Sequence, residues 1–449
     1  MDPVGTVFTV ECREMNEMGS GIVRYGKMVV FVPGLVPGDT AEIRIESTGK
    51  NFAIGNCLSF VCRSPQRIGG VCPDESLCGG CSLGHITWEL ENEVKRNTVR
   101  SALRRAGLQD VEPEPTLYGE NRCGYRNKMT LRFDPDAGRF GYSREGSAEV
   151  LPFHGCPLCP GVFSEIVLFL NERRDLTASL LPDALRLRSG EDGLIVTFSG
   201  RAEDPDAALR MTEALRGRFS EISLLFEQAE DGHVWLTAAE SRETSIRDHV
   251  GGLELRFSAE AFRQVNTPVF EKLLEVLLEM ASGEPFRSAA DLYCGSGVIG
   301  LALAKAFPSS RITGVEINPD AVEDAKKNAA RNGIGNIRFF AGDASTFRRR
   351  LGDRNRPELV TVDPPRAGLS ARMKRELIAL GPERIIYVSC NPQTLARDAR
   401  ELTDAGYTVG RVVPVNMFPV TKHIESVALI YRTELNGEKG KQTPASLSD

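Results

Sequence analysis

The stretch Asp291-Leu-Tyr-Cys-Gly-Ser-Gly-Val-Ile-Gly300 decides the fold of the C-terminal half of this 449-residue chain. It follows a strand-like apolar run and leads into a helix-like run. Gly295 and Gly297 allow a tight turn and a close approach of the backbone to a ligand. The spacing Gly295-x-Gly297-x-x-Gly300 formally matches the dinucleotide fingerprint, so an NAD site has to be considered. The stretch predicts a cofactor-binding loop between a strand and a helix.

The sequence around this loop alternates between strand-like and helix-like runs. Such an alternation predicts an α/β domain with a doubly wound parallel sheet, in which ligands bind at the carboxyl ends of the strands. Helical patterns are expected at 321–332 and 373–380. Strands are expected at residues 289–293, 311–315, 337–340, 359–362 and 385–389.

Acidic residues after successive strands distinguish between possible cofactors. The Asp291-x-x-Cys-Gly-x-Gly start resembles the first motif of class I S-adenosylmethionine-dependent methyltransferases. Glu316 ends the second strand, where a carboxylate can accept both ribose hydroxyls of either cofactor. Asp343 follows the third strand, where such methyltransferases hold the adenine amino group. The combination favours S-adenosylmethionine over NAD.

Two further motifs follow the next strands and carry reactive side chains. Asp363-Pro-Pro-Arg follows the fourth strand, and related turns occur in methyltransferases that act on amino groups, so this motif leaves the target atom open. Ser-Cys390-Asn-Pro ends the fifth strand. A thiolate that adds to carbon 6 of uracil makes carbon 5 nucleophilic enough to attack a sulfonium methyl group. A base must then remove the carbon 5 proton, and Glu425 in His423-x-Glu425 is the candidate. The alternatives are a packing role for Cys390 and an edge-strand charge for Glu425.

Taken in order, these motifs resemble the RNA uracil-5-methyltransferase family. Phe262-Arg-Gln-Val-Asn266 also resembles a Phe-x-Gln-x-Asn segment of that family. The resemblance implies that Cys390 is the nucleophile, that Glu425 is the general base, and that Asp363 positions substrate and donor. Val298 departs from the family, in which a polar Asn often stands at this position. The cofactor site implied by the resemblance consists of Gln264, Tyr293, Gly295, Gly297, Glu316, Asp343 and Asp363.

Cysteines in the first half of the chain suggest a metal centre. Cys72, Cys78 and Cys81 lie close together in a Gly-rich turn, and Cys156 comes much later, with Cys159 as a competing ligand. Three close thiolates and one distant thiolate suit zinc or an iron–sulfur cluster, and spacing alone leaves both open. One branch of the resembled family carries an N-terminal TRAM barrel and a 4Fe–4S cluster. The resemblance therefore implies a 4Fe–4S cluster with a structural or RNA-positioning role.

The length and composition of the chain indicate several domains. A chain of 449 residues exceeds one hydrophobic core, and short strand-like runs with Pro-Gly turns predict a small five-stranded barrel at the N-terminus. The expected architecture is an α/β multidomain protein with a Rossmann-like methyltransferase domain. Its parts are a TRAM-like, OB-like β-barrel at 1–62, a mixed α+β iron–sulfur RNA-binding domain at 63–87 and 120–255, the methyltransferase domain at 88–119 and 256–434, and a disordered tail at 435–449.

Charge and hydropathy limit the possible partners. The net charge is −6, but residues 120–144 contain six basic and three acidic residues, and residues 338–375 contain ten basic and four acidic residues. Such local patches suit RNA. We find no membrane-length apolar stretch and no signal peptide, so we expect a cytoplasmic protein without membrane association or an obligate protein partner.

The expected activity is 5-methylation of a flipped-out uridine in loop or single-stranded RNA, with Phe262 as a candidate to fill the gap. By the same family resemblance, the barrel and the cluster imply 23S ribosomal RNA as the substrate. Alternatives are a transfer-RNA uridine, an amino-group methyltransferase, and an RNA-binding iron–sulfur protein with an inactive methyltransferase fold.

Overall fold

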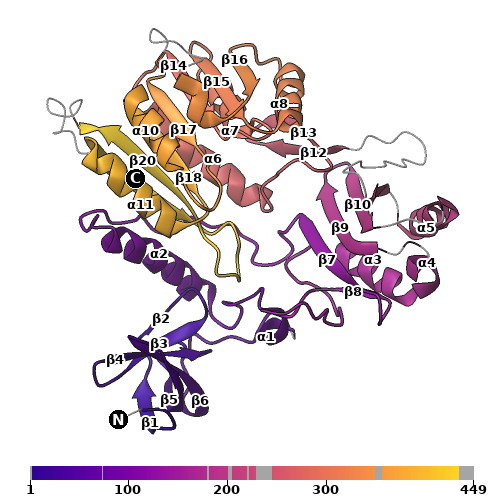
Figure 1. Cartoon of the computed structure of the whole chain (residues 1–449), viewed down its shortest axis with the longest axis vertical. Coiled ribbons are helices and arrows are strands. Elements are labelled where there is room, and N and C mark those ends of the chain that lie inside the picture. The colour runs from indigo at the N-terminus through magenta and orange to yellow at the C-terminus, as the bar shows by residue number, and fades with distance from the viewer. Residues whose placement is uncertain are drawn as a thin grey trace, which may run out of the picture.

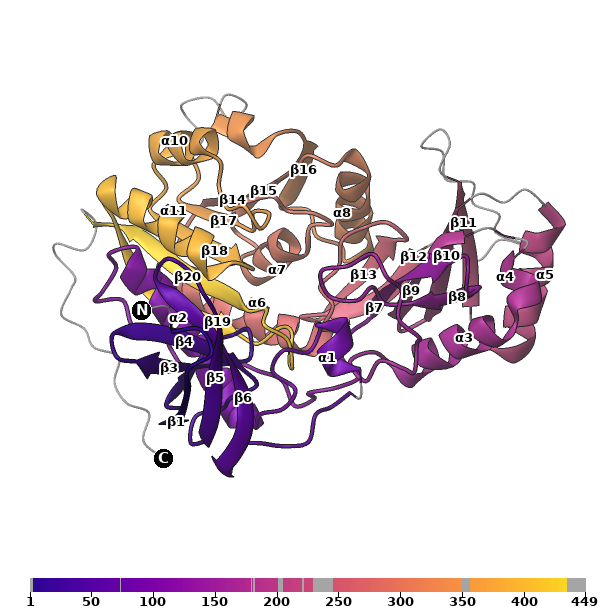
Figure 2. The ribbon, with the colours of Figure 1, turned by 60° about the horizontal axis from the view of Figure 1, so that its bottom comes forward.

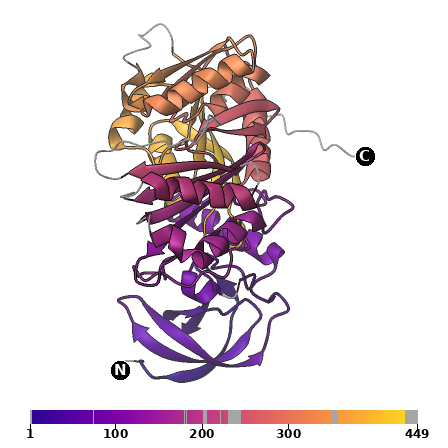
Figure 3. The same ribbon diagram turned by 90° about the vertical axis from the view of Figure 1, so that its right-hand side faces the viewer.

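The structure is a computed structural model that describes residues 3–72, 74–178, 180, 182–200, 205–219, 222–228, 245–348 and 356–433. The run 234–237, whose residue types predict a strand, and the tail expected at 435–449 lie outside these residues. Within them, the strands form sheets of six, five, two and seven strands (Figure 1). In Figure 3 the six-stranded N-terminal sheet lies at one end of the molecule and the seven-stranded C-terminal sheet at the other.

The N-terminal sheet curls around its own apolar core. Its strand order is β1-β5-β6-β4-β3-β2, and Val30, Val32, Ile43 and Ile45 are fully buried inside it. The sheet has six strands and not the five that were expected, because the two-residue strand β2 pairs with β3 at one edge. The strands are β1 (Val7–Glu11), β2 (Glu14–Met15), β3 (Ser20–Tyr25), β4 (Met28–Pro33), β5 (Thr40–Thr48) and β6 (Phe52–Cys62).

The middle of the chain forms a five-stranded mixed sheet, in the order β11-β10-β9-β7-β8, with helices packed against it. Along β7, Met129 and Leu131 are buried in the core that the helices cover, whereas Thr130 and Arg132 are exposed. The elements are β7 (Lys128–Asp134), β8 (Arg139–Gly141), α3 (Gly161–Glu172), α4 (Arg174–Ala178), β9 (Pro182–Gly190), β10 (Gly193–Gly200), α5 (Pro205–Arg218) and β11 (Ile222–Gln228). The short helix α1 (Glu75–Cys78) precedes this unit in sequence.

A two-stranded hairpin, β12 (Ser245–Val250) and β13 (Leu253–Ser258), joins the middle sheet to the C-terminal one. On one side, Glu191 N–H of the β9–β10 turn donates to the carbonyl of Arg247. On the other side, Asn328 accepts a hydrogen bond from Arg256 N–H at 2.8 Å. These contacts fix the hairpin against both units.

The C-terminal sheet has seven strands in the order β16-β15-β14-β17-β18-β20-β19. The first five are parallel, but β20 is antiparallel to both β18 and β19. The prediction of a parallel sheet is therefore wrong for β20, because the segment 416–424 is too short for the crossover that a parallel connection needs. The strands are β14 (Ser288–Leu292), β15 (Arg311–Glu316), β16 (Ile337–Ala341), β17 (Leu359–Val362), β18 (Arg384–Ser389), β19 (Tyr407–Val415) and β20 (Glu425–Arg432).

Helices cover both faces of this sheet. One face packs against α6 (Thr267–Ser282), α7 (Val298–Ala306) and α8 (Pro319–Arg331). The other face packs against α10 (Ala371–Leu380) and α11 (Pro392–Asp404), and also against α2 (Trp88–Arg105), which comes from the N-terminal part of the chain. Figure 2 shows α2 beside α11, β19 and β20. Among the described residues, no helix has the length and apolar character required to cross a membrane.

Candidate active site

The side chains of Asp363, Cys390 and Glu425 meet at one edge of the C-terminal sheet. Asp363 follows β17 and Cys390 follows β18, so both stand at the carboxyl ends of neighbouring parallel strands. Glu425 begins β20, which runs in the opposite direction. Since Ser389 pairs with Ser426, the register puts Cys390 opposite Glu425. The sheet thus brings together the three residues that were predicted for the catalytic site.

Burial and mutual repulsion disfavour the charged forms of these groups. Burial raises the pKa of Cys390 to about 11, with further contributions from the carboxylates of Glu425 and Asp363. Glu425 is 4% exposed, and burial together with Asp363 holds the pKa of its carboxyl well above the usual value. Burial, with Asp291 nearby, raises the pKa of Asp363 to about 7. These groups can therefore carry protons near neutral pH. Shifted pKa values of this kind are typical of sites that catalyse proton transfer.

One cation opposes this effect from the turn that follows Asp363. The guanidinium of Arg366 lowers the pKa of the Cys390 thiol, and Arg366 Nη2 lies 3.4 Å from His423 Nδ1. Asn391 Nδ2 donates to the carbonyl of Arg366 at 3.1 Å, which ties this turn to the residue after Cys390. Burial, with Arg366 close by, lowers the pKa of His423 to about 4, so this imidazole is neutral at physiological pH.

Buried side chains of α2 hold the segment 416–424 that leads to Glu425. Glu91 Oε1 accepts from Asn416 Nδ2 at 2.9 Å and from Val420 N–H at 2.8 Å. Lys95 Nζ donates to Asn416 Oδ1 at 2.5 Å and forms an ion pair with Glu91 at 3.1 Å. Both side chains are fully buried, and Val420 is held at a φ of 72°. Sequence reasoning missed this contact because it joins residues more than 300 positions apart.

The glycine loop has the backbone that its sequence predicts. Gly297 has a φ of 83° and caps α7, and a Cβ on it would lie 2.7 Å from Phe339. Gly295 has a φ of 53°, and its N–H donates to Glu316 Oε2 at 3.1 Å. Tyr293 adopts a φ of 64°, a value that is uncommon outside glycine. Glu316 thus lies next to the loop, at the end of β15.

A cavity opens beside this loop and reaches Asp363. Of the predicted cofactor residues, it is lined by Gln264, Tyr293, Gly295 and Asp363, and the side chain of Phe262 at its rim is 70% exposed. Polar residues that were not predicted also line it, namely Asp248, Arg263, Thr267 and Ser296. Arg263 occupies a variable position of the Phe-x-Gln-x-Asn segment, and Asp248 lies in a hairpin without any motif. Ser296 lies between Gly295 and Gly297, so the glycine motif could have pointed to it.

Asp343 lies apart from this cavity, after β16. Its carboxylate caps the 3₁₀ turn η1 (Ala344–Thr346), where Oδ1 accepts from Ser345 N–H and Oδ2 from Ser345 Oγ, both at 2.8 Å. The hydrogen bonds from Ser345 lower the pKa of Asp343. Glu316 at the end of β15 and Asp343 after β16 thus lie at the carboxyl ends of neighbouring parallel strands.

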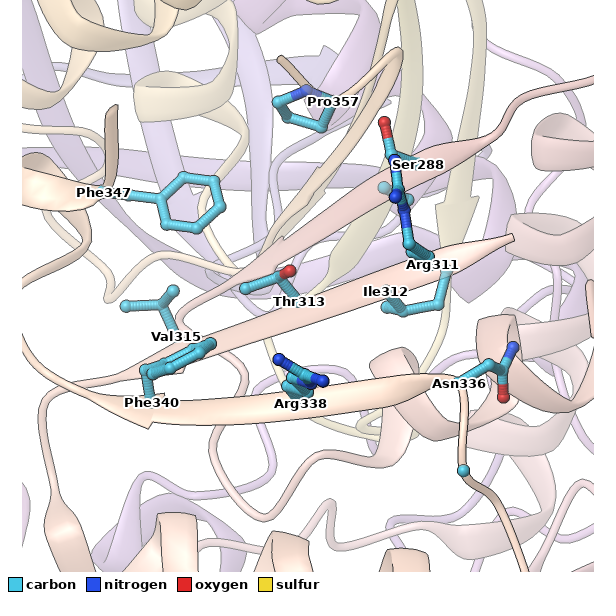
Figure 4. Close-up of a pocket in the computed structure, with 12 residues that line it drawn as sticks. Ser288, Arg311, Ile312, Thr313, Val315, Asn336, Arg338, Phe340, Phe347 and Pro357 are labelled. Carbon is cyan, nitrogen blue, oxygen red and sulfur yellow. The ribbon is translucent and has the colours of Figure 1, made fainter. Parts of the chain in front are cut away.

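A wider cavity of about 560 Å³ lies against β14, β15 and β16 (Figure 4). Arg311, Arg338 and Phe340 are among its lining residues. None of the residues predicted for catalysis or cofactor binding lines it. It is therefore separate from the site at the strand ends.

The predicted metal cysteines come from distant parts of the chain into one region. Burial raises the pKa of Cys72 and of Cys78, and the nearby Cys156 raises both further. Cys81 packs with Cys156 and Val420 in a small buried cluster. A hydrogen bond with Cys159 lowers the pKa of Cys156 to about 6. In the part of the chain that the structure describes, however, no three His, Cys, Asp or Glu side chains are arranged to hold a metal ion. The thiols share a region but do not form a ligand set.

Comparison with known proteins identifies the family. The model of the tRNA (uracil-5-)-methyltransferase family matches residues 206–433. An RNA methyltransferase of Caldanaerobacter subterraneus, itself uncharacterised, is 32% identical over 96% of this chain and 99% of its own length. A similarly described protein of Bacillus cereus is 30% identical over 94% of this chain and 95% of its own length.

This chain belongs to the tRNA (uracil-5-)-methyltransferase family. It is therefore an enzyme, a methyltransferase. The tRNA (uracil-54, C5)-methyltransferase of Pyrococcus abyssi, solved in complex with S-adenosyl-L-homocysteine, has a similar fold, with a TM-score of 0.71 and 24% identity. The match covers 94% of this chain and 100% of the archaeal one. The methyltransferase α/β fold is thus shared between the two proteins.

Proposed function

We propose that the protein methylates carbon 5 of a uridine in RNA with S-adenosylmethionine as donor. The observation that carries this proposal is the meeting of Cys390, Glu425 and Asp363 at one edge of the sheet, beside a cavity lined by the glycine loop. An amino-group methyltransferase has no use for a thiol at this position, and an inactive relative has no need of a buried carboxyl opposite it.

The proposed reaction proceeds through a covalent adduct. The Cys390 thiol gives its proton to solvent, and its sulfur adds to carbon 6 of uracil, so that the ring becomes an enolate. Carbon 5 attacks the methyl group of the sulfonium donor, whose sulfur leaves with the electron pair as S-adenosylhomocysteine. Glu425 then removes the proton from carbon 5, and the electrons of that bond expel the thiolate. Asp363 lies between the donor and the uracil in this proposal and contacts both.

Three features support the remaining assignments of the cofactor site. Tyr293, Gly295 and Gly297 form the loop that would approach the donor closely. Gln264 is 9% exposed and lines the same cavity. Glu316 and Asp343 follow neighbouring strands, where carboxylates suit a ribose and an adenine amino group.

The covalent step can be tested with RNA that contains 5-fluorouridine. We expect the protein, donor and this RNA to form a complex that survives denaturing electrophoresis, because fluorine at carbon 5 blocks the proton removal that releases Cys390. Cys390→Ser should form none, and Cys62→Ser, which removes an exposed thiol of the N-terminal sheet, should form as much as the parent. Methyl transfer by Cys390→Ser at the parental rate would refute the mechanism.

For the RNA class, we propose ribosomal RNA first and transfer RNA as the second candidate. The N-terminal sheet, which we interpret as a TRAM-like, OB-like barrel, does not separate the two. The match with the archaeal tRNA enzyme covers 94% of this chain. A protein that lacked a counterpart of residues 1–62 could not reach this coverage. The family name favours transfer RNA, whereas the cysteine set favours ribosomal RNA. Labelling 23S ribosomal RNA and transfer RNA side by side, with mapping of 5-methyluridine, distinguishes the two substrates.

We further propose that Cys72, Cys78, Cys81 and Cys156 bind a 4Fe–4S cluster and that residues 63–87 and 120–255 form the unit around it. The support is that these four thiols lie in one region and that thiolates are the ligands that iron–sulfur clusters use. We assign residues 1–62 to the barrel and residues 88–119 and 256–434 to the methyltransferase domain. The packing of α2 on the C-terminal sheet supports the last assignment.

Protein purified without oxygen should contain iron and sulfide in equal amounts. Cys72→Ala should lose both and unfold at a lower temperature, because cluster binding stabilises the folded state. Cys123→Ala should keep both. A colourless Cys72→Ala variant that melts like the parent would contradict the stabilising role.

A further inference from the structure

The cavity beside the glycine loop contains polar groups that none of the roles above employs. The Arg263 side chain is 7% exposed, and neither Nε nor Nη1 has a hydrogen-bond acceptor within the described residues. Its Nη2 donates to the carbonyl of Ser189 at 2.6 Å. Ser296 is 4% exposed, and its hydroxyl likewise has no partner among the residues described. Buried polar atoms are nearly always paired, so these two point to a missing polar ligand.

An acidic residue lies beside this cation in the same cavity. Asp248 is 7% exposed, and its Oδ2 is 3.5 Å from Arg263 Nη1, too long for a normal hydrogen bond. The same oxygen accepts from Thr267 Oγ1 at 3.0 Å. The cavity therefore presents a guanidinium and a carboxylate a few ångströms apart. A ligand with an ammonium and a carboxylate on one carbon has the matching charges.

We propose that Arg263, Asp248 and Ser296 bind the amino-acid end of the methyl donor. The guanidinium of Arg263 donates to the α-carboxylate, the carboxylate of Asp248 accepts from the α-ammonium, and the Ser296 hydroxyl completes the carboxylate contacts. This inference rests on the proposed use of S-adenosylmethionine. It adds a specificity-determining set of residues to that site. A charge-assisted pair in a site closed to water is stronger than a neutral hydrogen bond, so the set selects ligands that carry the amino acid.

Calorimetric binding of two compounds to the purified protein tests the proposal. S-adenosylhomocysteine carries the amino acid, and 5′-methylthioadenosine has the same adenosine and thioether without it. We expect Arg263→Met to weaken binding of S-adenosylhomocysteine by about 10- to 100-fold and to leave binding of 5′-methylthioadenosine unchanged. Arg263→Lys should recover part of the loss. Arg247→Met, on the same hairpin as Asp248 but outside the cavity, should bind both compounds like the parent.

Ser296→Ala serves as a second variant if Arg263→Met does not fold. It should weaken binding of S-adenosylhomocysteine alone, by about 3- to 10-fold. Equal losses for both compounds, or no loss for either, would overturn the proposal. A parent protein that binds the two compounds equally well would also overturn it while leaving the donor assignment intact. A parent that binds neither would remove the donor assignment itself, and this inference with it.

Discussion

At the scale of single residues, the chemistry depends on how Cys390 loses its proton. Burial and two carboxylates keep the thiol protonated at neutral pH, and Arg366 is the cation that opposes them. Glu425 has a raised pKa for the same reasons, so it holds a proton more readily than an exposed glutamate. Substrate binding must therefore shift this balance before the sulfur can attack. The carboxyls of Glu425 and Asp363 favour the protonated thiol, whereas Arg366 favours the thiolate.

The pH dependence of Cys390 alkylation should report this balance. A thiolate reacts and a thiol does not, so the rate with iodoacetamide should rise with pH toward the thiol pKa of about 11. Glu425→Gln removes a negative charge that raises this pKa, so its profile should shift to lower pH. Arg366→Ala removes a positive charge that lowers it, so its profile should shift to higher pH. Shifts of equal sign in the two variants would contradict this account.

At the scale of elements, α2 and the segment 416–424 form one unit although they are far apart in sequence. Glu91 and Lys95 satisfy the polar groups of this segment inside the protein, and Arg122 Nη2 joins Glu91 at 2.9 Å. Asn266 Nδ2 donates to the carbonyl of Met417 at 3.1 Å from the start of α6. These contacts hold in place the segment that precedes β20, the strand that begins at Glu425. Repacking of α2 would displace the proposed base.

Lys95→Met should test this unit. The substitution removes a buried ammonium that pairs with Glu91 and donates to Asn416 Oδ1 and to the carbonyl of Phe418. We therefore expect a loss of about 3–5 kcal/mol in the free energy of unfolding. The midpoint of urea denaturation measures it. Methyl transfer should fall in the fraction that stays folded. Lys326→Met, which removes an exposed ion pair with Glu323 on α8, should leave the midpoint nearly unchanged. Equal effects of the two variants would exclude a special role for α2.

At the scale of the whole molecule, the net charge of −6 conceals local positive surfaces. Within the first basic patch, Arg122 is engaged with Glu91 and Arg144 with Glu149, so these two are not available to phosphates. Arg126 and Arg132 are exposed, and no carboxylate of the described residues pairs with them. Arg126 also acts electrostatically on His423 and Cys156, which places it between the active-site edge and the cysteine region. We expect RNA to pass along this surface.

The salt dependence of RNA binding should reveal these contacts. If each arginine neutralises one phosphate of single-stranded RNA, Arg126→Ala/Arg132→Ala should lower the slope of log K against log salt by about 1.4. Affinity at low salt should fall as well. Arg173→Ala, whose side chain pairs with Asp175 at 2.9 Å, should keep the parental slope. An unchanged slope in the double variant would exclude this surface as an RNA contact.

The sequence alone determined the features that depend on neighbours in the chain. The turn at Gly295 and Gly297, the strand ends at Asp363 and Cys390, and the family motifs all lie in short segments, where local spacing implies local geometry. The same reasoning predicted a parallel sheet without an antiparallel strand and a barrel of five strands. Both differ from the structure, since strand direction and short edge strands depend on pairing partners. Only the tertiary structure decided which groups face each other: Glu425 opposite Cys390, α2 against the segment 416–424, and Arg263 with Asp248 in the donor cavity. Such contacts arise from packing between distant segments, and one-dimensional spacing carries no record of them.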